Sequence, residues 1–143
     1  MRKRTKKAFT LVEILIVVVI LGILAAIVVP QFTNATEDAQ QGNLRAQIKS
    51  LQNQIELYKA RTNAYPDLVA NGWDQLIDPN GDGDLSDGYI KQAPRNPAAP
   101  NGFQTTLSAT ATANAGWHYD ITNGELGATY YDEVNDVITP GTP

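Results

Sequence analysis

The segment formed by residues 9–29 constrains this chain more than any other feature, because it is almost entirely apolar and carries one carboxylate. At about 1.5 Å per residue, a helix of this length covers roughly 30 Å, which matches the hydrocarbon core of a bilayer. A basic stretch, MRKRTKK, precedes it, and positive residues favour the cytoplasmic side of a membrane. The sequence therefore predicts a membrane-spanning helix with a cytoplasmic N-terminus and the rest of the chain on the opposite side.

Glu13 is the carboxylate in this apolar segment. An ionised side chain at membrane depth is costly unless it is paired, faces protein or takes up a proton. The segment contains no cation that could pair with it. Cleavage between Ala8 and Phe9 would create an α-amino group four residues before Glu13. We expect this amine, from the same chain or from a neighbouring copy, to be the partner of Glu13.

The residues KKAFTLVEILIVVVILGILAAIVVPQF resemble the N-terminus of type IV prepilins and of type II secretion pseudopilins. The resemblance implies that a prepilin peptidase cuts after Ala8 and that Phe9 is then N-methylated. It further implies that Glu13 directs filament assembly and that Pro30 interrupts the helix. Ala8 departs from the family pattern, which usually has glycine before the cut, so processing is expected to be slower.

Two other interpretations of residues 9–29 explain less. A secretory signal peptide usually has a shorter apolar region without a glutamate, and no small-x-small cleavage site follows this one. A plain single-pass anchor has no need of Glu13. The pilin-like interpretation explains the basic leader and the carboxylate together.

Composition limits what the exported part can do. Five of the 11 Lys and Arg residues lie in the leader, which leaves the rest of the chain strongly acidic. An acidic surface argues against nucleic acid as the main partner. The chain has no cysteine and one histidine, His118. Disulfides are therefore excluded, and a zinc site or a Ser-His-Asp triad is disfavoured because few of the required side chains are available. We expect a structural protein and not an enzyme.

The chain is predicted to divide into four parts: a cleaved leader (1–8), a transmembrane and filament-core helix (9–30), an amphipathic helix (31–61) and a globular head (62–143). An apolar stripe with the spacing of one helix face runs along the third part and comprises Leu44, Ile48, Leu51, Ile55 and Tyr58. We expect this stripe to pack on the head. Proline in a helix interior removes a hydrogen bond, so a kink is expected at Pro30.

The segment DPNGDGDLSD, residues 78–87, is predicted to bind calcium weakly. Oxygen-bearing side chains at its first, third and fifth positions, with Gly83 at the sixth, match the opening half of an EF-hand loop. The twelfth position is Tyr89, where that loop has a bidentate glutamate, so later aspartates would have to supply oxygens. The candidate ligands are Asp78, Asn80, Asp82, Asp84 and Asp87. The alternative is a solvated acidic turn, since Asp, Asn and Gly all favour turns.

A β-hairpin is predicted near the C-terminus, where apolar residues alternate on both sides of Asn123-Gly124, a strong two-residue turn signal. Counting outward from that turn gives the pairs Ile121–Leu126, Tyr119–Ala128 and Trp117–Tyr130. All six side chains then share the face toward the helix, and His118 falls on the opposite, exposed face. Residues 104–113 are predicted to form a further strand at an edge. The fold class is α+β: a long N-terminal helix packed on a small antiparallel sheet, as in pilins.

Tyr65-Pro66 after the helix and Gly88-Tyr89-Ile90 also resemble the major pseudopilins, although Asn96-Pro97 stands where that family usually has Asp-Pro-Trp-Gly. The resemblance implies a filament subunit with a periplasmic head that is polymerised from the bacterial inner membrane into a periplasmic or cell-surface filament. It would be either a major pseudopilin of type II secretion or a type IV pilus subunit. Implied partners are copies of itself, the prepilin peptidase, minor pseudopilins or pilins, an inner-membrane assembly platform, and lipid before assembly. An enzyme with a pilin-like anchor is a remote third class.

Overall fold

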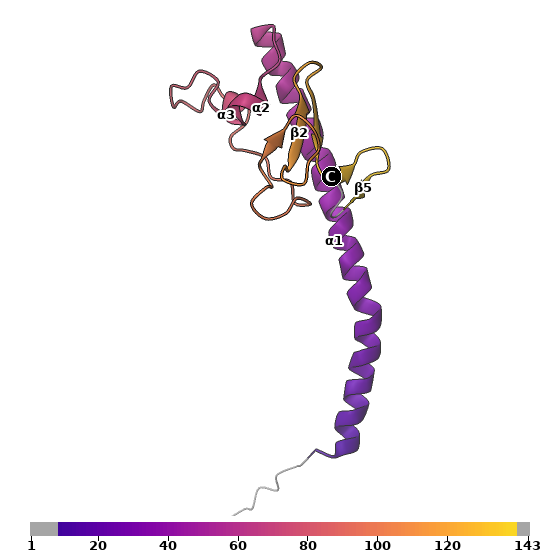
Figure 1. Cartoon of the computed structure of the whole chain (residues 1–143). Helices are drawn as coiled ribbons and strands as arrows, with labels where there is room; N and C mark the ends of the chain where they lie inside the picture. Colours follow the sequence, from indigo (N-terminus) through magenta and orange to yellow (C-terminus); the bar gives the residue numbers. More distant parts are fainter. Residues whose placement is uncertain (1–8, 140–143) are drawn as a thin grey trace, which may run out of the picture. The chain divides into compact units, whose positions relative to one another are not determined.

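The computed structural model describes residues 9–139 (Figure 1). The leader, including Ala8, and residues 140–143 lie outside the described residues. The chain forms two units, Met1–Glu37 and Asp38–Pro143.

The first unit contains the beginning of helix α1 (Leu11–Thr62), which is 52 residues long. The helix continues through Pro30 without a break. Its large apolar side chains from Leu11 to Phe32 are all exposed. Within the described part of the chain, α1 is the one helix that could cross a membrane by length and composition. The prediction of an apolar helix long enough to span a bilayer is therefore confirmed.

The second unit is built on the remainder of α1, and the predicted apolar stripe forms one wall of its core. Leu44 and Ile55 are fully buried, Ile48 and Leu51 are at most 9% exposed, and Tyr58 packs against the same cluster half-buried. The rest of the cluster comes from the loops and strands that follow: Leu68, Trp73, Leu76, Trp117, Tyr119, Leu126, Ala128 and Tyr131. Each large side chain buried here stabilises the fold by roughly 1.5 to 3 kcal/mol. This gain accounts for apolar residues recurring every three or four positions along the buried face of α1.

Two short helices that the sequence did not predict follow α1. Helix α2 (Leu68–Asn71) begins where the Asp67 side chain accepts a hydrogen bond from Ala70 N, at 3.0 Å. It ends at Gly72, whose positive φ of 67° suits glycine. Helix α3 (Asp74–Ile77) follows directly. Together they place Leu68, Trp73 and Leu76 in the core.

The strands form two small sheets, which confirms the α+β class. In the first sheet β1 (Leu107–Ser108), β2 (Trp117–Asp120) and β3 (Glu125–Ala128) lie in that order, with β2 and β3 antiparallel. The pair of β1 and β2 is parallel. The second sheet joins β4 (Tyr131–Asp132) and β5 (Val137–Ile138). The predicted strand at 104–113 is thus reduced to two residues, although it does lie at an edge.

The predicted hairpin register is wrong by two residues. Tyr119 pairs with Leu126 and Trp117 with Ala128, so the connection is four residues long instead of two. Asp120 explains the longer turn, because its carbonyl accepts from Gly124 N at 2.8 Å and its carboxylate from Thr122 N at 2.8 Å. A shift of two residues keeps every side chain on its own face of the sheet. The core therefore still receives Trp117, Tyr119, Leu126 and Ala128, whereas Ile121 moves into the turn.

His118 is the second correction, because it is half-buried and lies opposite Gly127 instead of Thr129. The imidazole occupies the space that the missing side chain leaves: a Cβ on Gly127 would come within 2.3 Å of His118 Nε2. Nδ1 is buried without a hydrogen-bond partner in the described part of the chain. Burial lowers the pKa of His118, and the nearby Glu125 partly opposes this.

Candidate functional site

The first candidate site is the start of α1, where Thr10 and Glu13 form a reciprocal cap. The Glu13 amide donates to Thr10 Oγ1 at 3.2 Å, while Glu13 Oε2 accepts from both Thr10 N and Thr10 Oγ1 at 2.8 Å. This is a capping box, which pairs backbone amides that the first turn of a helix leaves without partners. The partial positive charge at a helix N-terminus also favours a carboxylate in this place.

The cap shows that Glu13 has a partner within its own chain before any assembly. Sequence reasoning assigned Glu13 to an amine and missed Thr10, although threonine followed three residues later by glutamate is the capping-box pattern. All contacts of the carboxylate in the described residues go to Oε2. The second oxygen, Oε1, therefore has room for a donor from another molecule. Phe9, directly before the cap, is 80% exposed.

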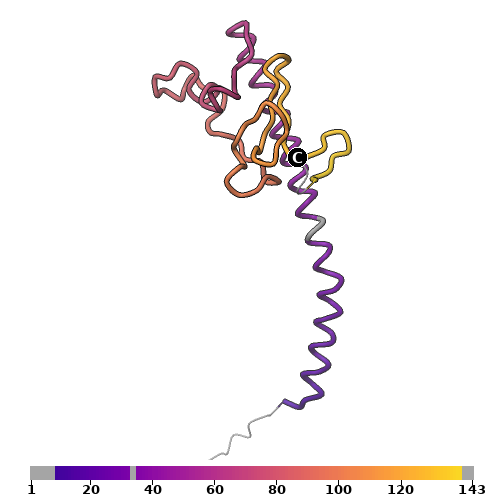
Figure 2. The backbone as a smooth tube through the Cα atoms, in the orientation of Figure 1, coloured from indigo at the N-terminus to yellow at the C-terminus, as the bar shows by residue number. Residues whose placement is uncertain are grey.

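The predicted calcium loop, residues 78–87, follows α3 (Figure 2). Asp78 Oδ1 accepts from Gly81 N at 2.8 Å and Asp78 Oδ2 from Gly83 N at 2.9 Å. Both glycines have positive φ, which this tight path requires. The Asn80 side chain donates to Asp82 Oδ2 at 3.0 Å. The loop thus draws together the three residues that the spacing singled out, but through hydrogen bonds of its own.

The two later aspartates of the loop do not complete a ligand set. Asp84 accepts from Ser86 N at 2.9 Å, which lowers the pKa of Asp84, and Asp87 is exposed. Among residues 9–139, no three acidic or histidine side chains lie together in a way that could hold a metal ion. The side chains of the loop therefore do not form a calcium centre in this structure, and calcium binding here stays a prediction from the spacing.

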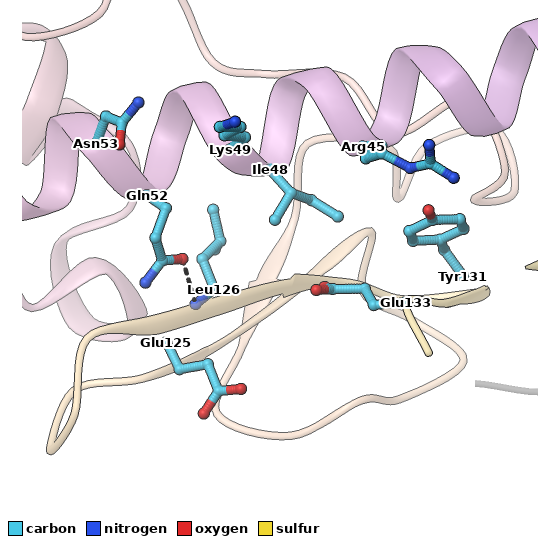
Figure 3. A pocket seen from close by; sticks show the side chains of 9 residues that line it. All are labelled: Arg45, Ile48, Lys49, Gln52, Asn53, Glu125, Leu126, Tyr131 and Glu133. Carbon is cyan, nitrogen blue, oxygen red and sulfur yellow. Dashed lines mark hydrogen bonds between the residues drawn. The ribbon is translucent and has the colours of Figure 1, made fainter. Parts of the chain in front are cut away.

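A groove of about 500 Å³ separates α1 from the edge of the sheet in the second unit (Figure 3). Arg45 and Lys49 line it from the helix, and Glu125 and Glu133 line it from the sheet side. Burial and the neighbouring Glu125 raise the pKa of Glu133. The groove is therefore lined by charges of both signs.

Gln52, which lines this groove, hydrogen-bonds to the backbone at the exposed edge of β3. The sequence pattern indicated only that Gln52 lies on the solvated side of the helix. Its side-chain amide donates to Gly124 O at 2.9 Å. It also accepts from Leu126 N at 3.3 Å, the bond drawn in Figure 3. It therefore pairs with β3 as a neighbouring strand would, which protects an edge that is otherwise open to other chains. No sequence signal marks this role, because its partners lie 72 and 74 residues away.

Comparison with known proteins now separates the classes that the sequence left open. The prokaryotic N-terminal methylation motif matches residues 3–29, and the family "Type II secretion system (T2SS), protein G" matches residues 31–132. The chain belongs to the protein G family of type II secretion systems. The protein G match covers the second unit up to Asp132, and the motif match covers the apolar helix that carries Glu13.

Several curated relatives carry the name type II secretion system core protein G. The one from Aeromonas hydrophila is 38% identical over 102 residues, which cover 68% of this chain and 71% of the relative. The Vibrio cholerae protein is 39% identical, with coverage of 68% and 67%. The Escherichia coli K12 protein is 31% identical over 135 residues, or 85% of this chain and 92% of the relative. No solved structure is significantly similar to the chain.

Proposed function

We propose that this protein is the major pseudopilin of a type II secretion system, a structural subunit of a filament that is built from the bacterial inner membrane. The observation that carries the proposal is the apolar first part of α1, which carries the methylation motif and begins with the Thr10–Glu13 cap. The protein G family supplies the secretion system. A periplasmic filament subunit needs no catalytic centre, which agrees with the composition.

Processing is the first step of the proposed function. A prepilin peptidase removes residues 1–8 and the new N-terminus at Phe9 is methylated. Ala8 is small, as glycine is, and so fits a peptidase site that accepts a small side chain before the cut. The cut leaves the exposed Phe9 immediately before Thr10, so that a charged amine stands beside the cap.

Assembly is the second step, in which lipid around the apolar helix is replaced by copies of the same helix. The exposed apolar side chains between Leu11 and Phe32 provide the surface for this exchange. Glu13 Oε1 accepts the Phe9 amine of an adjacent subunit, while Oε2 keeps its bonds to Thr10. A carboxylate and an ammonium that are both withdrawn from water depend strongly on being paired. Minor pseudopilins and an inner-membrane platform are further partners in this proposal.

A deletion strain tests the assignment to secretion. Without the gene for this chain, exoproteins are expected to accumulate in the periplasm, and the intact gene should restore their release. A type IV pilus subunit, the other candidate from the sequence, predicts the opposite pattern: normal secretion with loss of surface fibres, twitching or DNA uptake. That pattern would overturn the proposal.

Calcium binding by residues 78–87 is a separate proposal, supported by the ligand spacing and by the curl of the loop around Asp78. At calcium about tenfold above Kd, binding would stabilise the fold by about 1.4 kcal/mol. Chelation is therefore expected to lower the Tm of the detergent-solubilised protein by several degrees, and calcium, but not magnesium, should restore it. Asp82→Ala should remove the response and the control Asp38→Ala, on α1, should keep it. A wild-type Tm that does not respond to calcium contradicts the proposal.

A further inference from the structure

Asparagine followed by glycine is chemically labile, and this chain has four such pairs: Asn71-Gly72, Asn80-Gly81, Asn101-Gly102 and Asn123-Gly124. The glycine nitrogen attacks the side-chain amide carbon of asparagine, a ring closes and ammonia leaves. Water then opens the succinimide to aspartate or isoaspartate, so the net change is one water taken up for one ammonia lost. Glycine favours the attack because no Cβ shields its nitrogen. Attack requires that nitrogen to be free to approach the side chain.

The pair Asn123-Gly124 is held in the hairpin turn. Gly124 N donates to Asp120 O at 2.8 Å. The Asn123 side chain is fixed at both ends, accepting from Glu125 N at 2.9 Å and donating to Glu125 Oε2 at 3.1 Å. The Tyr65 ring covers Gly124 so closely that a Cβ there would lie 2.1 Å from it. Both reacting groups are thus engaged in hydrogen bonds, and Gly124 is also buried.

Two further pairs are protected by local hydrogen bonds. Gly72 N donates to Leu68 O at 3.0 Å, which closes the end of α2. Gly81 N donates to the Asp78 carboxylate at 2.8 Å. The side chain of Asn80 is held in addition by Asp82. In each pair the nitrogen that would attack is already a donor in the folded protein.

Asn101-Gly102 differs from the other three pairs, because neither the glycine nitrogen nor the asparagine side chain is firmly held by hydrogen bonds. Within residues 9–139, Gly102 N has no hydrogen-bond acceptor. The Asn101 side chain has one contact, a long hydrogen bond of 3.4 Å from Gln104 Nε2 to Oδ1. Both residues are exposed, and nothing lies within 4 Å of the position where a Gly102 Cβ would be. The turn therefore leaves nucleophile, amide and water all accessible.

We propose that Asn101 is a site of spontaneous deamidation in the folded protein, with water as the co-reactant. The product adds a negative charge to an already acidic head, and the isoaspartate form adds one carbon to the backbone of the turn. This turn matters to the core, because Gln104 O, three residues on, accepts from Asn96 N at 2.9 Å and from Trp117 Nε1 at 3.0 Å. Aged filaments would thus carry a chemically altered loop beside a structural anchor.

The test is peptide mapping of the full-length protein in detergent, incubated at mildly alkaline pH and analysed by mass spectrometry over time. Asn101 is expected to deamidate at least about tenfold faster than any of the other three pairs, which corresponds to about 1.4 kcal/mol in activation free energy. The same incubation in concentrated urea is the control, because unfolding frees all four glycine nitrogens and should bring the four rates together.

Asn101→Gln provides the matched variant, since it keeps a side-chain amide but lengthens the ring that must close. It should remove the early acidic species seen on isoelectric focusing, whereas Asn71→Gln should leave that species unchanged. Two results would overturn the proposal. One is a deamidation rate at Asn101 in the folded protein that is equal to or below that of another pair. The other is that Asn101 does not deamidate in the folded protein, although all four pairs deamidate in urea.

Discussion

Replacing Glu13 with alanine is expected to give a protein that inserts into the membrane but forms no filaments. The substitution leaves the Phe9 amine of the neighbouring subunit without its carboxylate. Breaking a buried ion pair by removing one partner costs about 3 to 5 kcal/mol, or more than about a hundredfold in association at each contact. Membrane fractionation measures insertion, and electron microscopy of sheared material measures filaments.

Two variants separate the charge of Glu13 from its other roles. Glu13→Gln keeps acceptors for Thr10 but removes the charge, so it should also fail to assemble if pairing with an ammonium is essential. Glu37→Ala removes an exposed carboxylate further along α1 and should assemble normally. Normal filaments from Glu13→Ala would contradict the proposed assembly mechanism.

Replacing Asn96 with alanine is expected to destabilise the second unit more than any other polar substitution described above. Asn96 is fully buried, and its side chain donates to Gly116 O at 2.6 Å and Thr129 O at 2.7 Å. It also accepts from Ala98 N at 2.8 Å. Each buried group that loses its partner costs about 1 to 3 kcal/mol. A total loss of about 3 to 5 kcal/mol is a large part of the stability of a domain.

Denaturant-induced unfolding followed by tryptophan fluorescence measures this loss, because Trp117 lies in the same core. Asn53→Ala is the matched control: Asn53 is exposed on α1, and such surface substitutions usually change stability by less than about 0.5 kcal/mol. Equal unfolding midpoints for Asn96→Ala and wild type would show that the buried amide does not hold the loops together.

The parts of this fold that could be predicted from the sequence are those marked by a regular spacing of apolar residues. The stripe from Leu44 to Ile55 repeats every three or four residues, and such a face has to be buried. The alternation in β2 and β3 likewise fixed which side chains enter the core, even though the register was shifted. Glu13 was predicted to be functional because a carboxylate in an apolar, membrane-spanning segment is costly unless it has a partner.

The parts that sequence missed depend on partners distant in the chain or on side chains in turns. Asn96 bonds to carbonyls 20 and 33 residues away, and no pattern around residue 96 indicates this. The hairpin register was decided by the Asp120 side chain and carbonyl, which favour a longer turn than Asn123-Gly124 alone. Thr10 is different, because the capping-box spacing with Glu13 was present in the sequence.

The mass of the N-terminal peptide from the protein as found in cells tests the central claim most directly. A filament subunit of this family that is processed as proposed begins with N-methyl-Phe9, so the peptide lacks residues 1–8 and is heavier by one CH2 unit, because a methyl group replaces a hydrogen. A chain that still begins with residues of the leader, or that is cut at a site other than Ala8/Phe9, would contradict the account. Glu13 would then have no amine four residues before it.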